Sequence, residues 1–286
     1  ESVGLVRLDL SDGDFIVSKS QNLSAQFAKI LDDVVGKAVV IVDHEQFHGL
    51  HCKRCIISLN GKSGRPFMLL RIQHQTHYDY APDVQSSAHE LCLHLRDTAA
   101  QHIIEQNLQI EPAPQQRYDT IDAFGNLRTH IAVEHSHQQF IATASSTVRT
   151  LPDTGSLPPS VAWQQAAERA AANPKLGPFL APSAQTVCDP ILRDYARPCF
   201  AAHSHLLDAC VALTQQIHRD CVYAPYVTTI FTPVLEFFQT RRGVCQDFSH
   251  LMLSVLRSMG LPCRYVSGYL LNSTATAEGT LIGADA

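Results

Sequence analysis

The sequence predicts an α+β protein, with a β-sandwich-like domain in its first part and a largely helical region behind it. Between residues 68 and 150, five or more short segments alternate apolar and polar residues, as half-buried strands do. From residue 161 onward, apolar residues instead recur every three or four positions, as in amphipathic helices. Residues 151–160, rich in Pro, Gly and Ser, separate the two patterns and form a credible linker.

Residues 1–67 stand apart from both patterns. Helical spacing over 23–36 stops at Gly36, and 37–45 are typical of a buried strand. The chain begins with Glu1, and its first methionine is Met68. Two interpretations stay open: sequence upstream of a natural start at Met68, and so not native coding sequence, or a native extension, which the orderly periodicity favours. We leave this segment unassigned.

Within 68–150, the first predicted strand places Leu70, Ile72 and His74 on one side. Asp122, Gly125 and Asn126 predict a tight turn between two later strands. Histidines are scattered evenly through the region, which favours hydrogen-bonded or solvated side chains over a metal cluster. They are His74, His77, His89, His94, His130, His135 and His137.

Residues 161–286 form the second predicted domain. Helices are expected over 161–171 and 202–221, and the second of these buries Cys210 on its apolar face. A short helix should follow, with Thr232 as its cap, Pro233 at its first position and Gly243 at its end.

Charge and composition exclude several classes of function. The chain has 22 Lys and Arg residues against 27 Asp and Glu residues, a net charge of −5, which argues against general nucleic-acid binding. No apolar run approaches the roughly 20 residues that span a bilayer, and no signal peptide opens the chain. We therefore expect a cytoplasmic protein without a membrane segment. Its oligomeric state is left open.

The nine cysteines have irregular spacing and an odd number, unlike a secreted disulfide framework, so reduced thiols are the simpler interpretation. They are Cys52, Cys55, Cys92, Cys188, Cys199, Cys210, Cys221, Cys245 and Cys263. Cys52 and Cys55, with His48 and His51 close by, resemble half of a zinc site. Strong zinc patterns pair two such knuckles, and a second is missing downstream. We expect no metal, and a redox or incidental role for this pair is favoured over a zinc-dependent function.

Cys245 opens the most strongly patterned helix of the chain. An apolar stripe starting at Phe248 runs to Met259, Gly260 and Pro262 end the helix, and an apolar strand follows. Gly243, just before, lets the backbone turn sharply and approach closely. The unpaired N–H groups at a helix N-terminus favour thiolate over thiol and can stabilise an oxyanion on an attacked carbonyl. The alternative is that Cys245 is one more small residue of the core.

The stretch "GVCQDFSHLMLSVLRSMGLPCRYVSGYL" resembles the central motif of the bacterial branch of the transglutaminase-like superfamily. The preceding "CVYAPYVTTIFTPVLEFFQTRRG" is similar to that family's approach to its cysteine. The β-rich region from Met68, "DAFGN" included, looks like its bacterial N-terminal domain. The resemblance covers about residues 68–286 and implies a papain-like core, in which a cysteine-bearing helix packs on an antiparallel sheet. It also implies a Cys-His-Asp triad with Cys245 as nucleophile and oxyanion donor, flanked by Gly243, Gln246 and Asp247.

The same resemblance implies a general base in a Ser-His-Ala-Trp-like segment after an Ala-Asp-Ala-like run, and an aspartate further on. The sequence reads "LIGADA" to Ala286, so we expect both residues beyond it, a C-terminally truncated core, and assign neither. His250 lies about 140° around the helix from Cys245 and should point away from the thiol. His203, His205 and His218 belong to another predicted helix, and no motif places them.

The family implies a thioester intermediate formed on a carboxamide or peptide bond. Water would then complete a protease or amidase reaction, a hydrolase, and an amine would complete an acyltransferase reaction. A protein or peptide is the implied substrate, and no cofactor is required. The alternative is a catalytically inactive scaffold or interaction protein with the same fold, as this chain would be without a base. The two differ in the reactivity of Cys245.

Overall fold

The computed structural model describes residues 5–10, 13–15, 39–43, 52–59, 69–98, 101–150, 161–275 and 280–285. The chain divides into two compact units. The helical unit is built around Thr154–Val266, and the β unit around Lys37–Asp153 with Ser267–Asp285. The boundary between them falls inside one strand, β13. The helix expected over 23–36 and the linker at 151–160 lie outside the described residues, whereas the strand expected over 37–45 is confirmed as β3 (Val39–Asp43).

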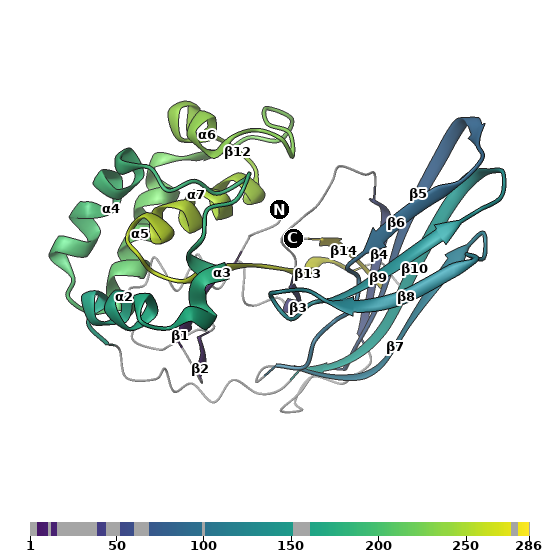
Figure 1. Ribbon diagram of the computed structural model, residues 1–286, viewed down its shortest axis with the longest axis horizontal. Coiled ribbons are helices and arrows are strands. Elements are labelled where there is room, and N and C mark those ends of the chain that lie inside the picture. Colours follow the sequence, from purple (N-terminus) through teal and green to yellow (C-terminus); the bar gives the residue numbers. More distant parts are fainter. Residues whose placement is uncertain are drawn as a thin grey trace. The chain divides into compact units, whose positions relative to one another are not determined.

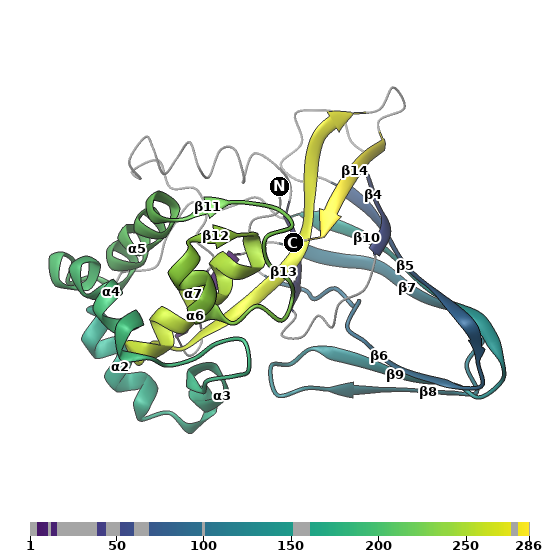
Figure 2. The ribbon, with the colours of Figure 1, turned by 90° about the horizontal axis from the view of Figure 1, so that it is seen from above.

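The β unit contains two antiparallel sheets (Figures 1 and 2). The strands of the larger sheet in this unit are β14 (Thr280–Asp285), β4 (Cys52–Leu59), β5 (Leu69–Val84), β10 (His137–Thr150) and β7 (Gln101–Glu111), and the end of β13 (Cys263–Ala275) pairs with β14. The smaller sheet consists of β6 (Ser87–Leu91), β9 (Leu127–Val133) and β8 (Gln116–Ile121). The β-sandwich-like prediction for this region is confirmed.

A small core joins the two sheets of the β unit. Ile131 and Val133 of β9 pack with Phe140 and Ala142 of β10, and all four are buried. Their alternation with less buried neighbours follows from the two-residue period of a strand. Burial of Leu70, Ile72 and His74 along β5 confirms the face that the sequence predicts. The histidine is buried because its ring is bonded on both sides: Tyr269 Oη lies 2.9 Å from Nδ1, and Thr76 Oγ1 lies 3.2 Å from Nε2.

The turn between β8 and β9 is organised by Asp122. Its carboxylate accepts hydrogen bonds from the backbone N–H groups of Phe124 (2.9 Å) and Asn126 (2.8 Å), and from the Arg128 side chain at 3.0 Å. Burial raises the pKa of Asp122, but these bonds outweigh that effect, and the pKa lies below its ordinary value. Gly125 occupies the left-handed position, with φ +82°. The expected tight turn is therefore present.

The helical unit contains all the described helices and several short strands, two of which lie next to the helix that starts at Cys245. Its helices are α2 (Trp163–Ala171), the 3₁₀ turn η1 (Pro174–Leu176), α3 (Gly177–Leu180), α4 (Pro190–Ala202), α5 (Leu206–Asp220), α6 (Val234–Thr240) and α7 (Cys245–Ser258). Its strands are β11 (Val222–Tyr223), β12 (Arg242–Gly243), β1 (Leu5–Leu10) and β2 (Gly13–Phe15). Strand β1 pairs antiparallel with the start of β13. No described helix is both long and apolar enough to cross a membrane.

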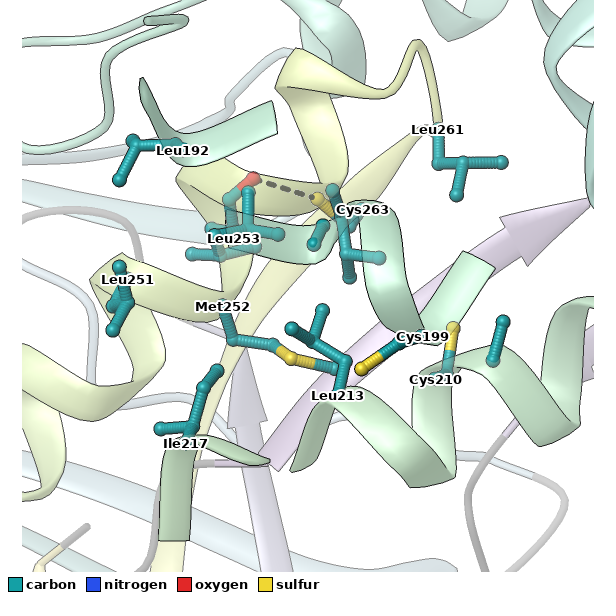
Figure 3. Close-up of a cluster of buried hydrophobic side chains, with 14 of the residues drawn as sticks. Leu192, Cys199, Cys210, Leu213, Ile217, Leu251, Met252, Leu253, Leu261 and Cys263 are labelled. Carbon is teal, nitrogen blue, oxygen red and sulfur yellow. Dashed lines mark hydrogen bonds between the residues drawn. The ribbon is translucent and has the colours of Figure 1, made fainter. Parts of the chain in front are cut away.

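Helix α7 is the centre of this unit and packs against α4, α5 and α6. The sequence predicts one apolar stripe, but every residue from Leu251 to Ser258 is buried. The polar residues among them form hydrogen bonds: the Arg257 guanidinium donates from one Nη atom to the Ala181 carbonyl and to Thr186 Oγ1, both at 2.8 Å. Figure 3 shows the surrounding core, to which α4, α5, α7 and the start of β13 contribute, with Cys210 in it as expected.

One helix prediction needs correction, and one helix is missed by the sequence analysis. Helix α6 begins after Pro233 rather than after a Thr232 cap, and it ends at Thr240 rather than at Gly243. The reason is Arg241, which turns the chain in the left-handed region (φ 57°) and lies over the Phe238 ring at 3.9 Å. Helix α4 is not predicted from its proline-rich sequence. It forms because Pro190 takes the first helical position and Asp189 caps it, accepting from Ile191 N at 2.9 Å.

We predict that Asp122→Ala lowers the free energy of unfolding by about 1–3 kcal/mol, because buried N–H groups lose their acceptor. The loss should narrow as the pH falls below about 4, where Asp122 takes up a proton in the unfolded chain before it does so in the folded one. Urea unfolding measures both effects. Asp83→Ala is the matched control: Asp83 is exposed and accepts one side-chain bond, from Gln138 at 2.8 Å, so the change should stay below about 0.5 kcal/mol. Equal losses in the two variants would contradict the role of Asp122.

Candidate functional site

Cys245 is the first residue of α7, directly after Val244, whose extended backbone (φ −111°, ψ 176°) leads into the helix. Its side chain is half-buried. Of the seven cysteines whose side chains the structure describes, five are buried and Cys188 is exposed. Cys245 and Cys188 are therefore the accessible thiols of the described residues, and of these only Cys245 begins a helix in the unit's core.

Asp247 fixes the turn Gly243–Cys245, called here the corner, through which the chain enters α7. The carboxylate is buried, with 4% of the residue exposed, and one of its oxygens accepts from Val244 N at 2.8 Å and from the Thr228 hydroxyl at 2.6 Å. Burial raises the pKa of Asp247, and the bonds from Thr228 and Val244 offset part of that rise. The carboxylate at the third helical position thus caps the helix, which is the structural role open to it in the sequence. Thr228 carries no sequence signal of this role.

Gly243 is required by close packing. A methyl group added at its Cα would overlap the Asp247 carboxylate and would lie 2.8 Å from Phe237 Cδ2, closer than real side chains approach. Its φ is not in the left-handed region, so close approach rather than a sharp turn explains the glycine. The expectation of close backbone approach holds, and the group that approaches is the side chain of Asp247.

The segment that contains β11, upstream of α7 in the sequence, lies against this corner (Figures 1 and 2). Strands β11 and β12 pair in parallel, Tyr223 opposite Gly243, and Ala224 N donates to the Gly243 carbonyl at 2.8 Å. Gln246 is half-buried, and its Nε2 points to the Ile230 carbonyl at 3.5 Å, a long hydrogen bond. Gln246 therefore helps to hold this segment rather than standing free beside the thiol.

The described histidines of the helical unit do not supply a base for Cys245. His250 lies further along α7 with its ring 5.6 Å from that of Tyr265, as its helical position predicts. Burial and, to a lesser extent, the charge of Arg257 lower its pKa to about 4. His203, His205 and His218 are exposed. Among the described residues, no side chain forms a hydrogen bond or ion pair with the Cys245 thiol.

The possible metal ligands are only partly described. Cys52 and Cys55 lie on β4, whose side chains are outside the described part, as are His48 and His51. Among the described side chains, no group of three or more His, Cys, Asp or Glu residues could hold a metal ion. The zinc hypothesis thus remains a sequence-based one.

We predict that Gly243→Ala destabilises the protein by about 1–3 kcal/mol, because the added methyl group displaces Asp247 or Phe237 from a packed site. It should also slow alkylation of Cys245, since the capped corner moves. Gly177→Ala is the control, because nothing lies within 4 Å of a methyl group added there. Thermal unfolding and thiol labelling of both variants provide the measurements. If Gly243→Ala is destabilised but its Cys245 is alkylated at the original rate, Gly243 serves packing and does not position the thiol.

His250 should make stability depend on pH. Its folded pKa of about 4 lies below the ordinary 6.5, so between these values the unfolded chain binds a proton that the folded chain does not. The contribution of His250 to the free energy of unfolding is therefore fully present above pH 6.5. It falls toward pH 4, by an amount of the order of 3 kcal/mol. His250→Gln should remove this contribution. Urea unfolding of both proteins at pH 7 and pH 4.5 tests it, and a difference between them that does not change with pH would refute it.

Comparison with known proteins identifies the family. Residues 70–149 match the bacterial transglutaminase-like N-terminal region, and residues 193–282 match the core of the transglutaminase-like superfamily. An uncharacterized protein of Mycobacterium tuberculosis (strain H37Rv) is 31% identical over 220 residues, covering 76% of this chain and 70% of its own. An uncharacterized protein of Mycobacterium leprae is 33% identical over 204 residues, 70% of this chain and 71% of its own.

A solved structure agrees at the level of fold. It is the crystal structure of a "putative cysteine protease" from Cytophaga hutchinsonii, which superposes with a TM-score of 0.54 at 17% identity and covers 80% of this chain and 83% of that one. Cys245, Gly243, Gln246 and Asp247 all fall inside the matched core. With its β-sandwich N-terminal region and its cysteine-headed helix, the chain belongs to the transglutaminase-like superfamily.

Proposed function

We propose that the protein is a cysteine enzyme in which Cys245 attacks a carboxamide or peptide carbonyl. The observation that carries this proposal is the position of Cys245: an accessible thiol at the first residue of α7, on a corner fixed by the buried Asp247 carboxylate. Membership of a superfamily whose core includes this helix supports it, as does the described fold neighbour.

The chemistry follows from the helix terminus. The sulfur of the thiolate bonds to the carbonyl carbon, and the C=O electron pair moves to oxygen to give a tetrahedral oxyanion. The backbone N–H of Cys245, which has no intrahelical acceptor, is one donor for that oxyanion. When the oxyanion collapses, the C–N bond breaks, and ammonia or an amine leaves with one added proton. A thioester on Cys245 remains.

The thioester has two fates. Attack by water releases a carboxylic acid and the thiol, which makes the protein a protease or amidase. Attack by a second amine forms a new amide, which makes it an acyltransferase. A protein or peptide substrate suits both outcomes. We assign no residue as the base. We also propose a reducing, cytoplasmic setting, which the odd number and irregular spacing of the nine cysteines favour.

Thiol labelling with iodoacetamide near neutral pH, read out by peptide mass spectrometry, tests the proposal. Cys188 is the internal control, because it is the more exposed thiol and exposure alone would make it react faster. We expect Cys245 to react at least about tenfold faster than Cys188, because the helix N-terminus stabilises its thiolate. A Cys245 that reacts no faster than Cys188 would favour the alternative, an inactive scaffold with the transglutaminase-like fold.

A further inference from the structure

The segment Val222–Phe231, called here the apolar arm, carries an unusual share of exposed apolar surface. Nine large hydrophobic residues are exposed in the described part of the chain, and five of them belong to this arm. Tyr226 is fully exposed and Phe231 is 68% exposed. The five are Val222, Tyr223, Tyr226, Val227 and Phe231. Scattered apolar residues on a surface need no explanation, but clustered ones mark an interaction site.

The arm is attached at several points to the residues around Cys245. Tyr223 pairs with Gly243, the Thr228 hydroxyl donates to Asp247 at 2.6 Å, and Gln246 reaches the Ile230 carbonyl at 3.5 Å. Paired strands lie about 5 Å apart, and two residues of chain span at most about 7 Å. The Cα atom of Tyr223 is therefore within about 12 Å of the Cα atom of Cys245, a distance that one bound peptide can span.

The end of the arm is a turn closed by hydrogen bonds between Thr229 and Thr232. The Thr232 backbone N–H donates to the Thr229 carbonyl at 3.0 Å, and Thr229 N donates to Thr232 Oγ1 at 2.8 Å. Phe231 lies inside this closed turn, and its N–H donates to Thr229 Oγ1 at 3.3 Å. Tyr226 has a φ of 68°, a left-handed conformation that a bulky residue seldom adopts. Such backbone strain is typical of functional segments.

We infer that the apolar arm binds a large apolar or aromatic side chain of the peptide whose carbonyl is attacked by Cys245. This inference rests on the proposed function and names its substrate class. The arm contains no charged residue, so it lacks the Lys and Arg side chains with which interfacial segments bind anionic lipid. Its attachment to the Cys245 corner favours a substrate over a partner that binds elsewhere. Selectivity for an apolar residue near the reacting bond follows from this placement.

The test uses the full chain and two peptidyl chloromethyl ketones that alkylate Cys245. They are identical except for Phe or Ser at the residue next to the one that carries the reactive group. We expect the Phe probe to label Cys245 at least about tenfold faster than the Ser probe. Tyr226→Ser and Phe231→Ser should each reduce this ratio to about threefold or less. Ile191→Ser is the matched control, an exposed apolar residue on α4 outside the arm, and should leave the ratio unchanged.

Iodoacetamide, which lacks a peptide side chain, separates this inference from the proposed function. Its rate at Cys245 should be the same in all four proteins, which also shows that the variants fold. A fast iodoacetamide reaction without a Phe preference, or with a preference that the arm variants keep, would overturn the inference alone. A slow one would overturn the proposed function and the inference with it. If the arm variants lose binding to neutral phosphatidylcholine vesicles, or self-association, but keep the probe ratio, the arm serves a membrane or a second copy and the inference is wrong.

Discussion

The buried carboxylate of Asp247 is the constraint on which the candidate site depends. It receives the N–H of Val244 and the hydroxyl of Thr228, so it ties the start of α7 to a segment that lies 19 residues earlier in the sequence. The cost of burying a carboxylate is visible in its raised pKa. Hydrogen bonds to the carboxylate offset part of that cost, and one of them fixes Val244, the residue before the cysteine. Gly243 is needed for the same arrangement, since only a residue without a side chain leaves room for the Asp247 carboxylate there.

The remainder of α7 explains why this corner can be rigid. The helix runs through the core of its unit and is buried on every side over its second half. Such a helix must satisfy its own polar groups. Ser254 and Ser258 accept from the backbone N–H groups of Val187 and Asp189, both at 3.2 Å, and so join the chain before α4 to the helix. Arg257 does the same for the loop around Thr186. The end of the helix opposite Cys245 is thereby anchored by hydrogen bonds as well as by packing.

Under the proposed function, the apolar arm and the start of α7 at Cys245 would have separate tasks. Reaction at a carbonyl needs a nucleophile and a donor held in fixed geometry, and choice among substrates needs separate contacts. In this unit the fixed part is buried and polar, as Asp247 shows, and the exposed part is apolar, as Tyr226 and Phe231 show. The hydroxyl of Thr228 joins them, because it belongs to the arm and bonds to the carboxylate.

The sequence by itself determined the α+β class, the strand face of Leu70, Ile72 and His74, the tight turn at Asp122, the helix that starts at Cys245 and the superfamily. Each of these is written in local spacing or in a contiguous motif, which a single sequence displays. Only the tertiary structure decided where α6 ends, that α4 forms despite its prolines, and that burial surrounds α7. It alone revealed Thr228 and the apolar arm, because contacts between residues far apart in the chain leave no periodic trace.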